Sequence, residues 1–208
     1  MALGIREHST WLRFKEGAIH WSKGGTSGIC DYVEGVITGV KYQDREFEWQ
    51  GKKIHKRELV IDIQDGSDKY SLTDGVDSNS GIQLQNKLLN TDVGETIRIS
   101  PSKKDDVRDG KPVVVTSGVF INVNNESIKQ KYNKDNPGNM PEWDKVRVNG
   151  KDVWDKTAQI EFLEQEMLEH FKNAKAVEVA STSGEFHESE IPSWDDSSSG
   201  GDTGDTPF

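Results

Sequence analysis

The sequence predicts a mainly β protein, built as a small barrel of short strands with one short helix. Three observations support this. Apolar and polar residues alternate with a period of two in several segments between Asp31 and Val123. A single stretch within that region, Ser80 to Asn90, changes to helical spacing. After Ala180 the composition becomes too polar to form a core.

The first predicted strand is DYVEGVITGVKY, Asp31 to Tyr42, which is rich in β-branched residues and contains Gly35 and Gly39. Glycine inside a strand often marks a bulge or a tight bend, which a small barrel needs in order to close. A polar hairpin follows, QDREFEWQGKKIHKR. The next strand is ELVIDIQDG, whose core-facing residues are predicted to be Leu59, Ile61 and Ile63.

The turn Asp65-Gly66 leads into KYSLT, a returning strand with Tyr70 and Leu72 on one face. The helix over residues 80–90 follows, and then ETIRIS, a charged loop SKKDDVRDGK and a last strand PVVVTSGVFINV. The order is three strands, a short helix and two strands. This order predicts the five-stranded Greek-key barrel called the OB fold.

The flanking segments predict four regions. Residues 1–28 form an N-terminal arm with a weak strand pattern, closed by a flexible break, GGTSG. Residues 29–125 form the barrel. Residues 126–177 form a linker and an amphipathic helix, which packs on the barrel or on a partner through a stripe of Trp154, Ile160, Leu163, Met167 and Phe171. Residues 178–208 form a disordered tail.

The tail is acidic. Of the 28 residues from Ser181 to Phe208, 21 are Ser, Thr, Gly, Asp or Glu, and none is Lys or Arg. The net charge of the chain is -10, and the seven acids of the tail leave only -3 for the first 180 residues. The acidic total therefore does not exclude a nucleic-acid partner for the body.

Compartment and cofactors are indicated by what the sequence lacks. Cys30 is the single cysteine, which excludes an internal disulfide and a cysteine-rich zinc site. No apolar run approaches a membrane span, and the N-terminus MALGIREHSTW has no signal-peptide core. We expect a soluble, cytoplasmic protein that has no cofactor and no membrane partner.

Two charged loops are the candidate binding surface. Cations and aromatic rings alternate in the first, and this mixture suits single-stranded nucleic acid, because cations follow the phosphates while rings stack on unpaired bases. In OB folds the two loops flank the binding face. The predicted residues are Tyr42, Arg45, Phe47, Trp49, Lys52, Lys53, His55, Lys56 and Arg57 in the first loop, Tyr70 on a strand, and Lys103, Lys104, Arg108 and Lys111 in the second loop.

Enzymatic readings find no support in the sequence. The five histidines include no metal-binding pair, and there is no phosphate-binding loop or nucleophile elbow. Asp74, Asp77 and Asn79 lack calcium-loop spacing, so a turn and helix cap explain them better. Cys30, at the start of a strand, is typical of a small core residue. We expect a binding protein, not an enzyme.

The chain ends in DDSSSGGDTGDTPF, and its terminal Phe offers a ring and a carboxylate in one small epitope beside Asp202 and Asp205. A predicted OB barrel followed by an acidic tail ending in Pro207 and Phe208 resembles the single-stranded DNA-binding proteins of bacteria and bacteriophages. Thr206 stands where the bacterial members have Ile, and the segment around Trp154 to Phe171 is more similar to a divergent phage member.

The resemblance implies a protein that coats single-stranded DNA during replication, recombination or repair. It also implies that the tip, Asp202, Asp205, Pro207 and Phe208, recruits a polymerase, helicase, primase or nuclease, and that the chain is cytoplasmic, in the host if phage-encoded. A homo-oligomer is compatible with the sequence. Two alternatives remain open: an OB-fold adaptor that binds proteins, and an RNA-binding module of the cold-shock type.

Overall fold

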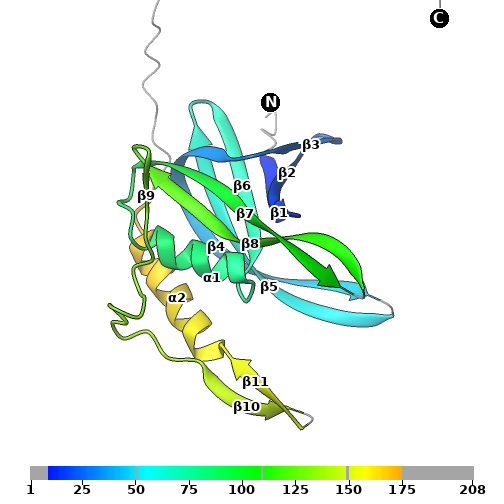
Figure 1. Ribbon diagram of the computed structural model, residues 1–208. Helices are drawn as coiled ribbons and strands as arrows, with labels where there is room; N and C mark the ends of the chain where they lie inside the picture. Colours follow the sequence, from blue (N-terminus) through cyan, green and yellow to red (C-terminus); the bar gives the residue numbers. More distant parts are fainter. Residues whose placement is uncertain (1–8, 50, 109, 149, 175–208) are drawn as a thin grey trace, which may run out of the picture.

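The computed structural model describes residues 9–174 apart from residues 50, 109 and 149. It is mainly β, with one large mixed sheet and two helices (Figure 1). The large sheet contains β1 (Thr10–Lys15), β2 (Ala18–Lys23), β3 (Thr26–Cys30), β4 (Val33–Trp49), β5 (Lys52–Asp65), β6 (Asp68–Gly75), β7 (Thr96–Arg108), β8 (Lys111–Val123) and β9 (Glu126–Ser127). The other elements are α1 (Asn79–Leu88), β10 (Asp144–Val148), β11 (Lys151–Asp155) and α2 (Thr157–His170).

The strand order in the large sheet is β3-β2-β1-β6-β5-β4-β7-β8-β9. β4 joins the two halves of this sheet, because its start pairs with β7 and the rest of it pairs with β5, both antiparallel. The three strands β4 to β6, the helix α1 and the two strands β7 and β8 stand where the sequence predicts them. The mainly β class is therefore confirmed.

β4 bends where it passes from one partner to the other. Gly35 has φ 151°, and a Cβ there would lie 2.5 Å from the carbonyl oxygen of Gln64. The β4–β5 register shifts between Ile37 and Gly39. The bulge predicted from the two glycines is therefore present, and only glycine fits the close approach at position 35.

The N-terminal region differs from the expectation. The GGTSG segment is not a flexible break, because Gly24 and Gly25 form a turn and Thr26–Cys30 is strand β3. Cys30 is therefore the last residue of a strand and not, as predicted, at the start of one. β1, β2 and β3 form an antiparallel meander, and β1 joins the sheet by pairing in parallel with β6. The turn at Gly17 touches β7 and β8: its backbone nitrogen donates to Thr116 Oγ1 at 3.1 Å, and a Cβ at Gly17 would clash with Lys103.

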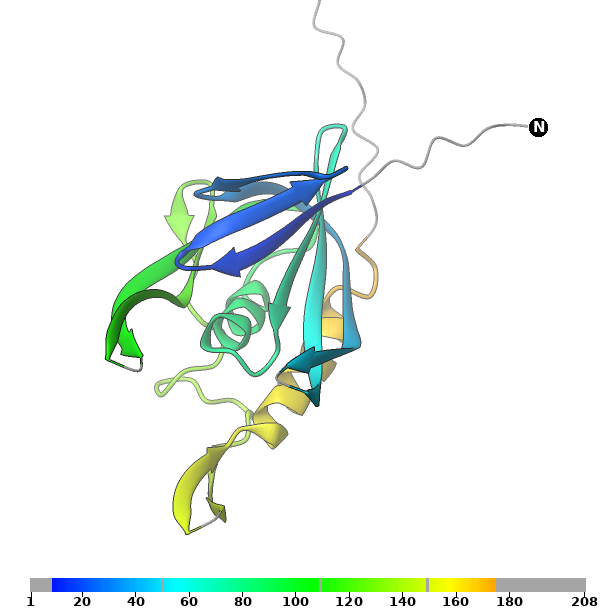
Figure 2. The ribbon, with the colours of Figure 1, turned by 90° about the vertical axis from the view of Figure 1, so that its right-hand side faces the viewer.

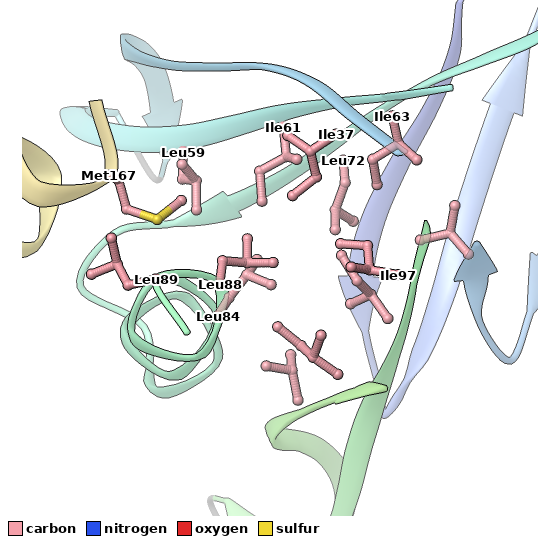
Figure 3. Packing of buried hydrophobic residues seen from close by; sticks show 14 of the residues in the cluster. Ile37, Leu59, Ile61, Ile63, Leu72, Leu84, Leu88, Leu89, Ile97 and Met167 are labelled. Atoms are coloured by element: carbon pink, nitrogen blue, oxygen red, sulfur yellow. The ribbon is translucent and has the colours of Figure 1, made fainter. Parts of the chain in front are cut away.

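The core lies between the sheet and the two helices, as Figure 3 shows for side chains of β4, β5, β6, β7, α1 and α2. Leu59, Ile61 and Ile63 are buried, as predicted, and so is Leu72. Val60, on the opposite face of β5, is also buried, which alternation alone does not predict. The Ser78 hydroxyl caps α1 by accepting from the Gly81 amide at 2.8 Å, and Asp74 accepts from Ser78. This agrees with the predicted turn and cap.

α2 packs against α1 and β4 and buries Leu163, Met167 and Phe171 in the common core. The predicted stripe is wrong at its first member: Trp154 belongs to β11 and is 57% exposed. The segment expected to be a linker also contains the β10–β11 hairpin, which projects from the start of α2 (Figure 1). No helix of the described residues has the length and hydropathy to cross a bilayer.

Candidate nucleic-acid interface

The outer face of the sheet is hollowed where β1, β2 and the second half of β4 approach one another. The hollow has a volume of about 610 Å³. Its wall combines indole rings, guanidinium groups, an imidazole, an amide and hydroxyl groups. The lining residues are Trp11, Leu12, Arg13, His20, Trp21, Ser22, Ser27, Gln43, Arg45 and Thr73. We call this hollow the β1–β4 groove.

Most of the groove comes from the N-terminal meander, for which the sequence predicts no binding role. β1 alternates strictly, so Leu12 and Phe14 enter the core while Trp11 and Arg13 point outward. Trp11 is 49% exposed. The signal that could have located these residues is the alternation in TWLRFK, with a ring and a cation on the polar face.

Trp21 is held in place by the strand beside it. Trp21 is paired with Gly28 of β3, and a Cβ on Gly28 would lie 2.7 Å from three atoms of the indole ring. The ring therefore occupies the space above a residue that has no side chain. Trp21 lines both the β1–β4 groove and a second hollow of about 620 Å³ on the other side, which Cys30, Tyr32 and Tyr70 also line.

Two arginines of the groove converge on one buried acid. Glu58, on β5, is only 4% exposed. Arg13 Nη2 lies 3.3 Å from Glu58 Oε1, and Arg45 Nη1 lies 3.7 Å from Glu58 Oε2. Gln43 Nε2 donates to Glu58 Oε2 at 3.3 Å. A buried carboxylate is tolerated only with such partners, and both guanidinium groups stay about half exposed to solvent.

The first predicted loop is not irregular: β4 and β5 stay paired as far as Trp49 and Lys52, forming a long two-stranded arm. Lys52 and Lys53 are exposed near its tip, and His55 Nδ1 lies 3.0 Å from Glu46 Oε1. Phe47 and Trp49 belong to β4, but their side chains lie outside the described part of the structure. The side chain of Lys56 lies over Gly75, and a Cβ added to Gly75 would come within 2.6 Å of Lys56 Cε.

Tyr42 and Arg57 face away from the groove, toward the helices. The Tyr42 hydroxyl donates to Gln85 Oε1 at 2.8 Å, and burial raises the pKa of Tyr42. Arg57 donates to both carboxylate oxygens of Glu164 on α2, at 2.9 and 3.0 Å, and also pairs with Asp44. These hydrogen bonds raise the pKa of Arg57. The structure thus uses Tyr42 and Arg57 to attach α1 and α2.

The second predicted loop is also a hairpin arm, because β7 and β8 remain paired as far as Arg108 and Lys111. Lys103, Lys104 and Lys111 are exposed, whereas the side chain of Arg108 lies outside the described residues. Figure 1 and Figure 2 show the two arms extending to the same side of the molecule with the N-terminal meander between their bases. Asp105 and Asp106 interrupt the cations of this arm.

Tyr70 is half-buried at the edge of the core and lines the second hollow. Burial is the main cause that raises the pKa of Tyr70, and the nearby acids raise it further. The predicted tip, Asp202, Asp205, Pro207 and Phe208, lies outside the described residues. Among residues 9–174, with the three gaps given above, no group of three or more His, Cys, Asp or Glu side chains is placed to hold a metal ion.

The groove therefore contains one residue that the sequence predicted to bind nucleic acid, Arg45. Four more groove residues were not predicted from the sequence to bind: Trp11, Arg13, His20 and Trp21. The predicted lysines lie outside the groove, on the two arms. No protein-family model, curated protein or solved structure matches this chain.

Proposed function

We propose that the protein binds single-stranded DNA without strong sequence preference, and that the strand runs along the β1–β4 groove between the two arms. The observation that carries this proposal is one hollow that joins the outward-pointing Trp11 to two half-exposed arginines, with Trp21, which packs partly against the core, at its edge. Single strands are bound by this combination, because the rings stack on bases and the guanidinium groups meet phosphates.

We further propose that β4 to β8 form an OB barrel. The strand order β6-β5-β4-β7-β8, with α1 between β6 and β7, supports this assignment. The groove then lies on the outer face of the first three barrel strands, and the two arms correspond to the two loops that flank an OB binding face. The meander β1–β3 extends that face beyond β6.

The arms have a supporting electrostatic role in this proposal. Within the described residues Lys52, Lys53, Lys103 and Lys104 make no ion pair, so no carboxylate competes with a phosphate for these ammonium groups. Arg57 and His55 lie on the face of β4 and β5 opposite Arg45, where they pair with Glu164 and Glu46, and they are left out of the proposed interface. Recruitment of replication and repair proteins by the acidic tip remains part of the proposal and rests on the sequence resemblance alone.

A titration of the full-length protein with labelled oligo-dT, oligo-U and duplex DNA tests the proposal. We expect oligo-dT to bind more tightly than duplex, with an affinity that falls linearly with salt on a double-logarithmic plot. Equal or absent binding to both forms of DNA would contradict single-strand binding. A flat salt response would contradict the role of the cations, and preference for oligo-U would favour the RNA-binding alternative.

A protein-binding adaptor is the second candidate, and the β10–β11 hairpin favours it. Val146 and Val153 are paired across the hairpin and both are exposed, as is Trp154 on the other face. Exposed apolar side chains on both faces of a projecting hairpin are typical of an interaction surface. If substitutions in the β1–β4 groove leave nucleic-acid binding unchanged, the result favours the protein-binding adaptor over the nucleic-acid-binding proposal.

A further inference from the structure

Glu58 is an unexpected residue in a surface proposed to bind a polyanion. It lies beneath the β1–β4 groove, it is almost fully buried, and its negative charge opposes the approach of phosphates. A neutral side chain there would give the groove a more positive potential. The retained carboxylate therefore needs an explanation that goes beyond charge.

The geometry around Glu58 supplies one. Its two oxygens are shared: Oε1 faces Arg13 from β1, and Oε2 faces Gln43 and Arg45 from β4. Glu58 stands on β5, and β6 separates β5 from β1 in the sheet. The two arginines thus reach toward one carboxylate from strands on opposite sides of it. Gly75, the residue paired with Glu58 on β6, has no side chain, and the side chain of Lys56 occupies the space above it.

We propose that Glu58 is a positioning residue, which holds Arg13 and Arg45 extended over the groove so that both meet the phosphates of a bound strand. This inference rests on the proposed function. A free arginine must give up many rotamers on binding, and ordering one such side chain weakens affinity by roughly two-fold to twelve-fold. Glu58 orders two of them before the strand arrives.

The sign of the effect of removing the charge distinguishes positioning from simple repulsion. If Glu58 only repels phosphates, Glu58→Gln tightens binding, because the groove gains one unit of positive charge. If Glu58 positions the arginines, Glu58→Gln weakens binding despite that gain. Glu58→Asp adds a second test, because it keeps the charge but withdraws the carboxylate by one methylene group from both arginines.

The experiment measures dissociation constants for labelled oligo-dT at several salt concentrations, using the full-length protein and its variants. We expect Glu58→Gln and Glu58→Asp each to bind roughly three-fold to ten-fold more weakly than the unchanged protein. Glu48→Gln is the matched control, since Glu48 is an exposed acid on the same arm, opposite Lys53. It removes the same charge and is expected to bind equally or more tightly.

A further measurement separates positioning from a general loss of structure. In the presence of Arg13→Ala, the effect of Glu58→Gln is expected to shrink, because one of the two positioned groups is already absent. Near-ultraviolet circular dichroism identifies the folded variants, and Glu58→Asp decides the question if Glu58→Gln does not fold. Tighter binding by Glu58→Gln, or unchanged binding by Glu58→Asp, overturns this inference alone. Failure of the unchanged protein to bind oligo-dT overturns the proposed function first.

Discussion

Replacing Trp11 with Ala tests the location of the interface most directly. Trp11 lies on the outer face of β1, two residues before Arg13, and it is paired with Ser22 on β2. About half of its surface is accessible, which is enough for one base to stack. A stacked base contributes about 1–3 kcal/mol to binding, which corresponds to roughly five-fold to 150-fold in affinity.

We expect Trp11→Ala to weaken oligo-dT binding within the lower part of that range, about five-fold to thirty-fold, because a half-exposed ring offers only part of its surface. The slope of affinity against salt is expected to stay the same, since no charge is removed. The assay is a fluorescence-anisotropy titration with labelled oligo-dT at three or more salt concentrations. Stability is expected to change little, because Trp11 is outside the core.

Trp154→Ala is the matched control, because Trp154 is similarly exposed but stands on the β10–β11 hairpin. Its affinity for oligo-dT is expected to equal that of the unchanged protein. Unaltered binding by Trp11→Ala would refute the β1–β4 groove as the site. Equal losses from both substitutions would refute the assignment of the site to one face of the sheet.

Three further predictions concern stability and the tail. Met167→Ala is expected to lower the free energy of unfolding by about 2–5 kcal/mol in urea, because Met167 is fully buried between α2 and the sheet; an unchanged midpoint would mean that α2 is not part of the core. Tyr132→Phe is expected to cost about 1 kcal/mol at pH 7, because it removes the 2.6 Å hydrogen bond to Glu166 that, with Lys131, lowers the pKa of Glu166. A carboxylate whose pKa is lower in the folded protein than in the unfolded chain stabilises the fold at pH values above its unfolded pKa, and this stabilisation is lost as the pH falls. The difference in unfolding free energy between Tyr132→Phe and the unchanged protein should therefore shrink below about pH 4.5 in urea titrations; a constant difference would contradict this reasoning. Deleting residues 202–208 is expected to preserve or increase oligo-dT affinity, since a tethered polyanion competes for the cations, and a loss of binding would instead place the tip in the groove.

The strands and the first helix of the central region were predictable because their signals are local. Alternation in ELVIDIQDG identifies Leu59 and Ile61 as core residues, since successive side chains of a strand point to opposite faces. The two glycines of β4 predicted its irregularity, and at Gly35 few other residues tolerate the backbone conformation. The predicted loops were placed correctly along the chain, but strand pairing continues through them almost to the turns and makes them arms.

The binding surface was less predictable. Arg57 and Tyr42 looked equivalent to Arg45 in sequence, yet they lie on the side of β4 and β5 that faces α1 and α2. Glu164, the partner of Arg57, is 107 residues away along the chain, and no local pattern announces such a contact. Strand alternation can separate two faces, but it does not say which face a helix will cover.

The sequence by itself determined the β class, the positions of α1 and the central strands, and the acidic composition of the tail, because each of these follows from residue types within a few positions of one another. Only the tertiary structure decided that β1 pairs in parallel with β6, which brings Trp11 and Arg13 into the groove that Arg45 lines. It also decided that Glu58 is buried between the two arginines. Contacts of this kind depend on which distant strands become neighbours, and the free energy that selects them comes from burying a shared core, not from the local preferences of either strand.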